Sequence, residues 1–241
     1  DIVLQPNYSE IRSRDDVDTS IEFLNRKFRC VAIPSNMICT IDFDKAVAMS
    51  EDGYFYVLHR FYDYDKIFQW IDKHQMLQTI SISVGVKQKD KSLIERISES
   101  NLRIDFITID IAHGHSYGLK EMVNFIRSRL SRDVKIIGGN IGTSEAAIDL
   151  ANWGCDAVKV GLSMGKSCTT YNCTGVGTPM FSTVKKIADV SPIPVIADGQ
   201  IREVGDVCKA LVAGATMVMI GSEFAKCMDS PAESVKVTKP N

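Results

Sequence analysis

The chain has 241 residues, and its 28 Lys+Arg against 30 Asp+Glu leave a net charge of −2. Apolar residues make up 45%, while Gly (16) and Pro (7) are few, which excludes a disordered or fibrous chain. The near-neutral charge gives no electrostatic footprint for nucleic acid. No apolar run approaches the roughly 20 residues that span a bilayer, so we expect neither nucleic-acid nor membrane partners.

Cysteine usage indicates the compartment. The seven cysteines are odd in number and contain no C-x-x-C pair, which argues against a zinc ribbon or a thioredoxin-like motif. Free thiols are typical of a reducing compartment, and the N-terminal residues lack the pattern of a signal peptide. The sequence therefore predicts a cytoplasmic protein.

Short apolar runs alternate along the chain with longer segments of helical period, as expected for parallel strands buried on both faces. The predicted strands are Val31–Pro34, Tyr54–His59, Thr79–Val84, Phe106–Ile111, Val134–Gly138, Ala157–Val160, Pro194–Ala197 and Met217–Gly221. The predicted helices include Tyr64–Gln75, Lys91–Ser100, Gly118–Leu130, Ser144–Trp153, Met180–Ala188 and Val204–Ala213.

Eight strands is the closing number of a (β/α)8 TIM barrel. The alternative, an open doubly wound sheet, is disfavoured because no dinucleotide fingerprint follows the first strand. We expect residues 1–241 to form a single barrel domain. Only Ser222–Asn241 follow the eighth strand, and within them Glu223–Cys227 could begin a helix.

The longest loop, Leu162–Thr178, follows the sixth strand, at the end of a barrel where active sites are built. Cys168 lies in its middle among Ser and Thr residues. A thiol in a polar loop can be activated as a thiolate, so Cys168 is the candidate nucleophile, with Cys173 a weaker one. The alternative for each is an unreactive loop thiol.

The ends of the last two strands carry a second cluster. Asp198 ends the seventh strand and precedes Gly199, and the eighth strand ends in Gly221 and Ser222. A carboxylate there can accept ribose hydroxyl protons, and exposed backbone N–H groups can bind a phosphate. The alternative is that these residues only form tight turns at the rim of the barrel.

A third cluster follows the fourth strand. Asp110, His113 and His115 suggest a metal site, but His-x-His alone is weak and no third ligand stands at a standard spacing. Asp110 is better interpreted as a hydrogen-bond acceptor for substrate or cofactor.

Two short pairs end the first two strands. Asn36-Met37 and His59-Arg60 offer an amide, a thioether and a cation that would suit a heteroaromatic base and an anionic group. Each residue alone is more often a packing or surface residue.

Taken together, these segments resemble the IMP dehydrogenase/GMP reductase family over Ile2 to about Glu233, nearest to the GMP reductase branch of Firmicutes-type bacteria. The resemblance rests on Ser13–Asp18, Pro34–Met37, Tyr54–Phe61, Ser81–Lys87, Ile107–Ser116, Gly139–Thr143, the Cys168 loop, Ile196–Gly199 and Gly214–Ser222. It implies a (β/α)8 barrel and the reaction GMP + NADPH → IMP + NH3 + NADP+, in purine salvage.

The resemblance also implies roles for single residues. Cys168 would attack C2 of the purine to form a covalent thioimidate, Thr170 would assist the leaving amine, and Asp198 would hold the ribose hydroxyls. The substrate base would face Asn36 and Met37. The implied phosphate ligands are Ser163, Gly165, Lys166, Gly199, Gly221 and Ser222.

For the cofactor, the resemblance implies that Asp110, Ala112 and Gly114 face the nicotinamide half of NADPH. A monovalent cation, usually potassium, would sit against the loop near Gly165 and Cys168. Family members are homotetramers, so we expect a homotetramer here.

The sequence departs from the family in three places. Ser163-Met164-Gly165 replaces the usual Gly-Pro-Gly, and Gln200 replaces the second glycine after Asp198. The C-terminal flap and last helix are missing, which should expose the outer apolar faces of strands eight and one. We interpret this as an omission of disordered residues. The alternative is a truncated paralogue that binds purine nucleotides without turnover.

IMP dehydrogenase is the other enzyme that the loop fits. It usually carries regulatory domains after the second strand, and His59 to Thr79 leaves no room for them.

Overall fold

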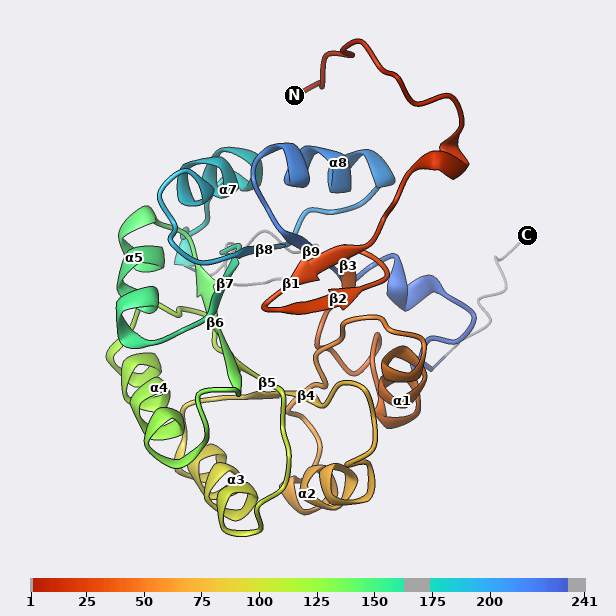
Figure 1. The fold of residues 1–241 in the computed structure, drawn as a ribbon. Coiled ribbons are helices and arrows are strands. Elements are labelled where there is room, and N and C mark those ends of the chain that lie inside the picture. The colour runs from red at the N-terminus through yellow and green to blue at the C-terminus, as the bar shows by residue number, and fades with distance from the viewer. Residues whose placement is uncertain (1, 163–173, 234–241) are drawn as a thin grey trace, which may run out of the picture.

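The computed structural model describes residues 2–162 and 174–233, and its centre is a curled sheet of seven parallel strands (Figure 1). The order across the sheet is β3-β9-β8-β7-β6-β5-β4, so the first strand of the sheet pairs with the last. The strands are β3 (Ala32–Pro34), β4 (Ser81–Val84), β5 (Phe106–Asp110), β6 (Lys135–Ile141), β7 (Ala157–Val160), β8 (Val195–Asp198) and β9 (Met217–Ile220).

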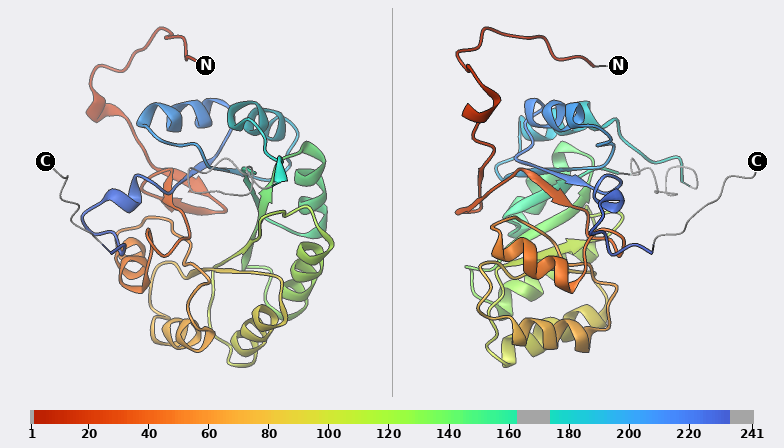
Figure 2. Two further views of the ribbon diagram at one scale, coloured as in Figure 1. Left: turned by 180° about the vertical axis from the view of Figure 1, so that it is seen from behind. Right: turned by 90° about the vertical axis from the view of Figure 1, so that its right-hand side faces the viewer.

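Helices surround this sheet on its outer side (Figures 1 and 2). They are α1 (Phe43–Glu51), α2 (Tyr64–Lys73), α3 (Gln88–Glu99), α4 (Tyr117–Arg129), α5 (Ser144–Trp153), α7 (Met180–Ala188) and α8 (Val204–Val212). The helix ends follow local chemistry: in α5, for example, the Thr143 hydroxyl accepts from the Ala146 N–H, and Gly154 ends the helix at φ +107°. This arrangement confirms the predicted (β/α)8 fold class.

Two apolar clusters divide the barrel into an inside and an outside. Along β5, Phe106 belongs to the inner cluster, while Ile107 and Ile109 belong to the outer one, against the helices. This alternation follows from the two-residue period of a strand. The interior is aromatic near the amino ends of the strands, and at β5 it ends with the carboxylate of Asp110.

A hairpin closes the amino end of the barrel, and the sequence did not predict it. β1 (Ile21–Phe23) and β2 (Arg26–Phe28) are joined by Leu24 and Asn25, both at positive φ. Phe23 packs against the interior aromatic Phe55, and Phe28 packs against Phe55 and Phe106, all with tilted rings; the Phe23 ring centre lies 5.4 Å from that of Phe55. In Figure 1 the hairpin lies across the ring of strands.

The predicted strand Tyr54–His59 is wrong as a regular strand. The segment forms a single parallel bridge, Leu58 to Ile82 of β4, so β3 and β4 are the two edges of the sheet. Phe55 to Leu58 are nonetheless buried. The Phe55 side chain packs against the hairpin and the Tyr56 hydroxyl donates to Thr79 O, so side chains rather than a ladder hold the segment.

The prediction that the outer apolar faces of the first and last strands are exposed is also wrong. On β9, Val218 is fully buried and Ile220 is 8% exposed. The chain beyond β9 forms the short 3-10 turn Phe224–Lys226 in place of the expected helix start and folds back onto α1. There Lys45 pairs with Asp229 at 3.2 Å. Of the helices that the structure describes, none is long and apolar enough to cross a membrane.

Candidate active site

The carboxyl ends of the strands bring the described candidate residues to one end of the barrel. Asn36 and Met37 follow β3, Asp110 ends β5 and Asp198 ends β8. In parallel strands these ends share one rim, which is where barrel enzymes place their chemistry.

A buried lysine joins two of these residues. Lys159 of β7 has a side chain only 3% exposed, and its Nζ lies 2.8 Å from Asp110 Oδ1 and 2.7 Å from Asp198 Oδ2. We call Asp110 and Asp198 the carboxylate pair. Each is about one-fifth exposed, so the pair faces the mouth while the ammonium lies beneath it.

A glycine makes this reach possible. Asp110, Gly139 and Lys159 stand in register on the neighbouring strands β5, β6 and β7. A Cβ on Gly139 would lie 2.6 Å from Lys159 Cβ and 2.8 Å from Lys159 O, which is too close for any side chain. The empty position on β6 lets the lysine side chain cross that strand to Asp110.

The charges stabilise one another. Burial would raise the pKa of Asp110, but the Lys159 ammonium, with smaller effects from Asn36 and Arg60, brings it below its usual value. Burial would likewise lower the pKa of Lys159, but the carboxylate pair raises it. The site therefore holds one ammonium between two carboxylates at neutral pH.

Asn140, at the end of β6, supports the pair from the side. Its Nδ2 donates to Asp198 Oδ2 at 2.9 Å and to Gly161 O at 2.8 Å. Its Oδ1 is buried and has no hydrogen-bond partner in the described part of the chain. The Asn36 Nδ2 is likewise buried without a hydrogen-bond partner in the described part of the chain. Two amide groups beside the carboxylate pair can therefore form hydrogen bonds with a ligand.

The end of β9 lies against the end of β3. Ser35 N donates to Ile220 O at 2.9 Å, and a Cβ on Gly221 would lie 3.1 Å from Ser35 Oγ and 4.0 Å from Met37 Sδ. Met37 is 40% exposed, so its thioether is accessible beside the glycine. The structure thus places Met37 and the Gly221-Ser222 turn side by side.

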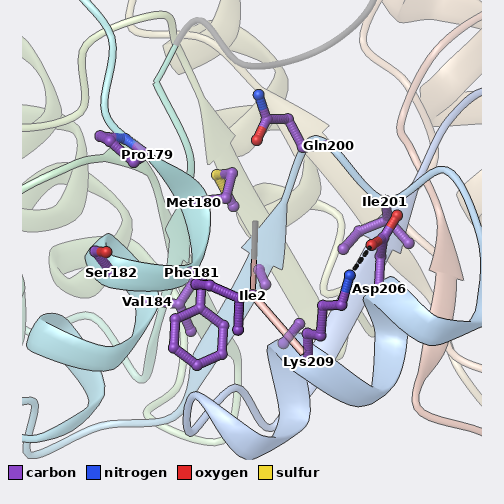
Figure 3. A pocket seen from close by; sticks show the side chains of 13 residues that line it. Ile2, Pro179, Met180, Phe181, Ser182, Val184, Gln200, Ile201, Asp206 and Lys209 are labelled. Carbon is purple, nitrogen blue, oxygen red and sulfur yellow. Dashed lines mark hydrogen bonds and ion pairs between the residues drawn. The ribbon is translucent and has the colours of Figure 1, made fainter. Parts of the chain in front are cut away.

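The turn after β8 has an unusual backbone. Gly199 has φ +120° and Gln200 has φ +57°, so a non-glycine residue occupies the left-handed region. Both line a cavity of about 290 Å³ between α7 and α8, together with Met180, Phe181 and Ile2 (Figure 3). This cavity shares the Gly199-Gln200 turn with the candidate site.

The loop after β5 places the cofactor candidates at the rim. Ala112 is exposed, while Gly114 is buried and donates its N–H to Asn140 O at 2.7 Å. His115 pairs with Asp149 of α5 at 2.8 Å, away from Asp110, and His113 is exposed. Within residues 2–162 and 174–233, no three His, Cys, Asp or Glu side chains form a group that could hold a metal.

The remaining predicted residues lie outside the described residues. They are Ser163, Gly165, Lys166, Cys168, Thr170 and Cys173, and two of them, Gly165 and Cys168, are the positions of the expected cation site.

His59, at the end of the segment 54–59, is a buried titratable group at the same rim. It is 2% exposed, its ring stacks on Tyr62 with centres 4.3 Å apart, and its Nδ1 accepts from the Phe61 N–H. Burial lowers the pKa of His59, an effect that the nearby Asp42 only partly offsets.

We predict that this burial makes stability fall in mild acid. Above about pH 6.5 the His59 imidazole is neutral in both the folded and the unfolded chain. Below that pH it binds a proton in the unfolded chain, whereas in the folded chain it binds one only at the lower pKa, so the unfolded state is favoured as the pH falls. The free energy of unfolding, measured in urea at about pH 5.5 and about pH 8, should drop less in His59→Gln than in the wild type. His113→Gln, at an exposed position, is the matched control; an equal drop in all three proteins would contradict the prediction.

With this geometry in place, comparison with known proteins identifies the family. Residues 1–239 match the IMP dehydrogenase / GMP reductase domain. The chain belongs to this family. It is 43% identical to the GMP reductase of Acidovorax sp. (strain JS42) over 238 residues, which are 98% of this chain and 73% of that protein. It is also 44% identical to the GMP reductase of Delftia acidovorans (98% and 72% covered) and 42% identical to that of Mesoplasma florum (98% and 74%).

Membership in the IMP dehydrogenase / GMP reductase family confirms the resemblance seen in the sequence. Two residues of the site are not predicted from the sequence: Lys159 lies within the predicted strand Ala157–Val160, and Asn140 lies within the segment Gly139–Thr143. The available indication for Lys159 was a single charge inside the apolar strand Ala157–Val160, where a charge needs a partner. For Asn140 no sequence pattern stood out.

Proposed function

We propose that this protein catalyses the NADPH-dependent reductive deamination of GMP to IMP and ammonia. The observation that carries the proposal is the identity of 42–44%, over 98% of the chain, to proteins named GMP reductase. The buried amides and the carboxylate pair at the barrel mouth support it, because they form a polar floor able to hold a nucleotide.

The carboxylate pair would divide the two ligands between them. Asp198 accepts the ribose hydroxyls of GMP, because a carboxylate held by Lys159 and Asn140 keeps its second oxygen for further donors. Met37 packs on the purine and Asn36 faces it. Gly199, Gly221 and Ser222 contribute to the phosphate site.

The described residues fit a nicotinamide cofactor at the end of β5. Asp110, Ala112 and Gly114 would hold it, and the Asn36 side chain lies close enough to Asp110 to lower the pKa of that carboxylate. When bound, NADPH supplies the hydride that reduces C2 of the purine. The protein positions that carbon and excludes water from it.

The chemistry on GMP would belong to the loop after β7. The Cys168 thiolate attacks C2, the C2–N2 bond breaks, and ammonia leaves with a proton delivered through Thr170, giving the thioimidate. Ser163, Gly165 and Lys166 add contacts to the phosphate. A potassium ion at Gly165 and Cys168, a homotetramer and a cytoplasmic location complete the proposal.

The test is GMP-dependent oxidation of NADPH by the purified chain, followed at the absorbance of the reduced cofactor. Oxidation that requires GMP and releases ammonia supports the proposal. Turnover of IMP with NAD+ would replace it by IMP dehydrogenase activity. Binding of GMP without turnover of either pair would indicate the purine-nucleotide-binding paralogue.

A further inference from the structure

Lys159 is a buried charged group of the mouth, and nothing in the proposed reaction uses it directly. Its Nζ contacts the carboxylates of Asp110 and Asp198, which arrive on strands to either side of β7. A buried ammonium is stable only when paired, so its presence depends on both partners. Conversely, the ionisation of the two carboxylates depends on the lysine.

Without the cation, the two carboxylates would face each other in a poorly hydrated pocket. Both carboxylates lie within 2.8 Å of the Lys159 Nζ position, and two carboxylates so close together do not both stay ionised near neutral pH. One of them would therefore take up a proton. The only other charge that acts on Asp110 in the described residues is the more distant Arg60. The neutral amide of Asn140 is the other donor to Asp198. Lys159 therefore decides the ionisation of the pair.

We infer that Lys159 is a positioning residue that holds Asp198 ready for the purine nucleotide and Asp110 ready for the cofactor, and so links the two ligand sites. The inference rests on the proposed function, which assigns one ligand to each carboxylate. Three features carry it: the two contacts from one atom, the near-complete burial of the ammonium, and Gly139, which leaves room for the side chain to reach Asp110.

The experiment compares Lys159→Met, Asp110→Asn and the double variant with the wild type. Lys159→Met keeps the length of the side chain but removes the charge. It should weaken GMP binding about 10- to 100-fold, the scale for losing a supporting partner of a ligating group. It should also make the GMP Kd depend on pH between about 6 and about 9, since one carboxylate now titrates there.

The double variant separates positioning from packing. With Asn in place of Asp110, no like charge opposes Asp198, so GMP binding should return to within a few fold of the wild type and lose its pH dependence. The KM for NADPH should stay raised in both variants that carry Asp110→Asn. If the double variant binds GMP no better than Lys159→Met, the lysine has only a structural role and the inference is overturned.

The wild-type arm keeps this inference distinct from the proposed function. If wild-type protein does not bind GMP by calorimetry, the proposed function fails at that point. The inference is then judged by urea unfolding. A free energy of unfolding of Lys159→Met that falls as the pH rises from about 5 to about 9, and that the added Asp110→Asn makes independent of pH over this range, supports the linked pair. No such pH dependence in Lys159→Met overturns it. If Lys159→Met does not fold, soluble double variant with wild-type GMP affinity supports the inference, and insoluble double variant overturns it.

Discussion

Replacing Cys168 by Ala should abolish GMP-dependent NADPH oxidation, lowering kcat by at least about 10^4-fold. Losses of this order follow removal of the nucleophile in enzymes with covalent catalysis. Binding should survive, because the proposed ligands Asp198, Met37 and Gly221 are untouched. The Kd of GMP, measured by calorimetry on the same preparation, should remain within a few fold of the wild type.

Other thiols provide the controls for this experiment. Cys208 is exposed on α8, and Cys208→Ala should retain wild-type turnover. Cys155 is buried, and burial raises the pKa of its thiol to about 12, so it stays protonated and unreactive. Alkylation at neutral pH, followed by mass spectrometry, should therefore modify position 168 but not 155, and GMP should protect position 168. Full turnover in Cys168→Ala would refute the thioimidate route.

Replacing Gly161 by Ala should cause the largest loss of stability of any single change considered. Gly161 has φ +149°, and a Cβ there would lie 1.8 Å from Asp198 O, a backbone atom that cannot rotate away. The ends of β7 and β8 would have to separate, which also breaks the Asn140 bond to Gly161 O. We expect the free energy of unfolding to fall by more than about 4 kcal/mol, the range of severe core defects.

Substitutions at two other glycines serve as controls, because a Cβ there meets no other atom and only the backbone effect of losing glycine remains. Gly175 has φ +69° with no atom within 4 Å of a Cβ, so Gly175→Ala should cost only about 1 kcal/mol. Gly205 lies in α8 with open space around it, so Gly205→Ala should stabilise by about 0.5–1 kcal/mol. Urea unfolding of the three variants tests the order. A loss below about 1 kcal/mol for Gly161→Ala would show that the two strand ends are not in contact.

The sequence predicted the barrel because its strands are short, apolar and separated by amphipathic helices. β5 and β7 are examples: the largely apolar segment Ala157–Val160 has the same bounds as β7, and Phe106–Ile111 exceeds β5 by one residue. The hairpin was missed because its turn, Leu24-Asn25, lacks the glycine that marks most two-residue turns. The segment 54–59 was overpredicted because burial of side chains produces the same apolar pattern as a paired strand.

The site was predictable where a residue type alone suggests chemistry. Asp110 and Asp198 were singled out because carboxylates at strand ends rarely serve only packing. Lys159 and Gly139 were not, because their roles depend on register between neighbouring strands, which no local pattern contains. Met37 beside Gly221 is a similar case, since the two residues are brought together only by the β3–β9 pairing.

The aromatic hairpin has a consequence for ligand traffic. With Phe23 and Phe28 filling the amino end of the barrel, we expect ligands to enter the interior from the opposite rim, which carries Asp110 and Asp198. Under the proposed function, two substrates and three products must then share one entrance. The ligand that sits deeper has to arrive first and leave last, so steady-state kinetics should follow an ordered sequence, with the shallower product inhibiting the release of the deeper one.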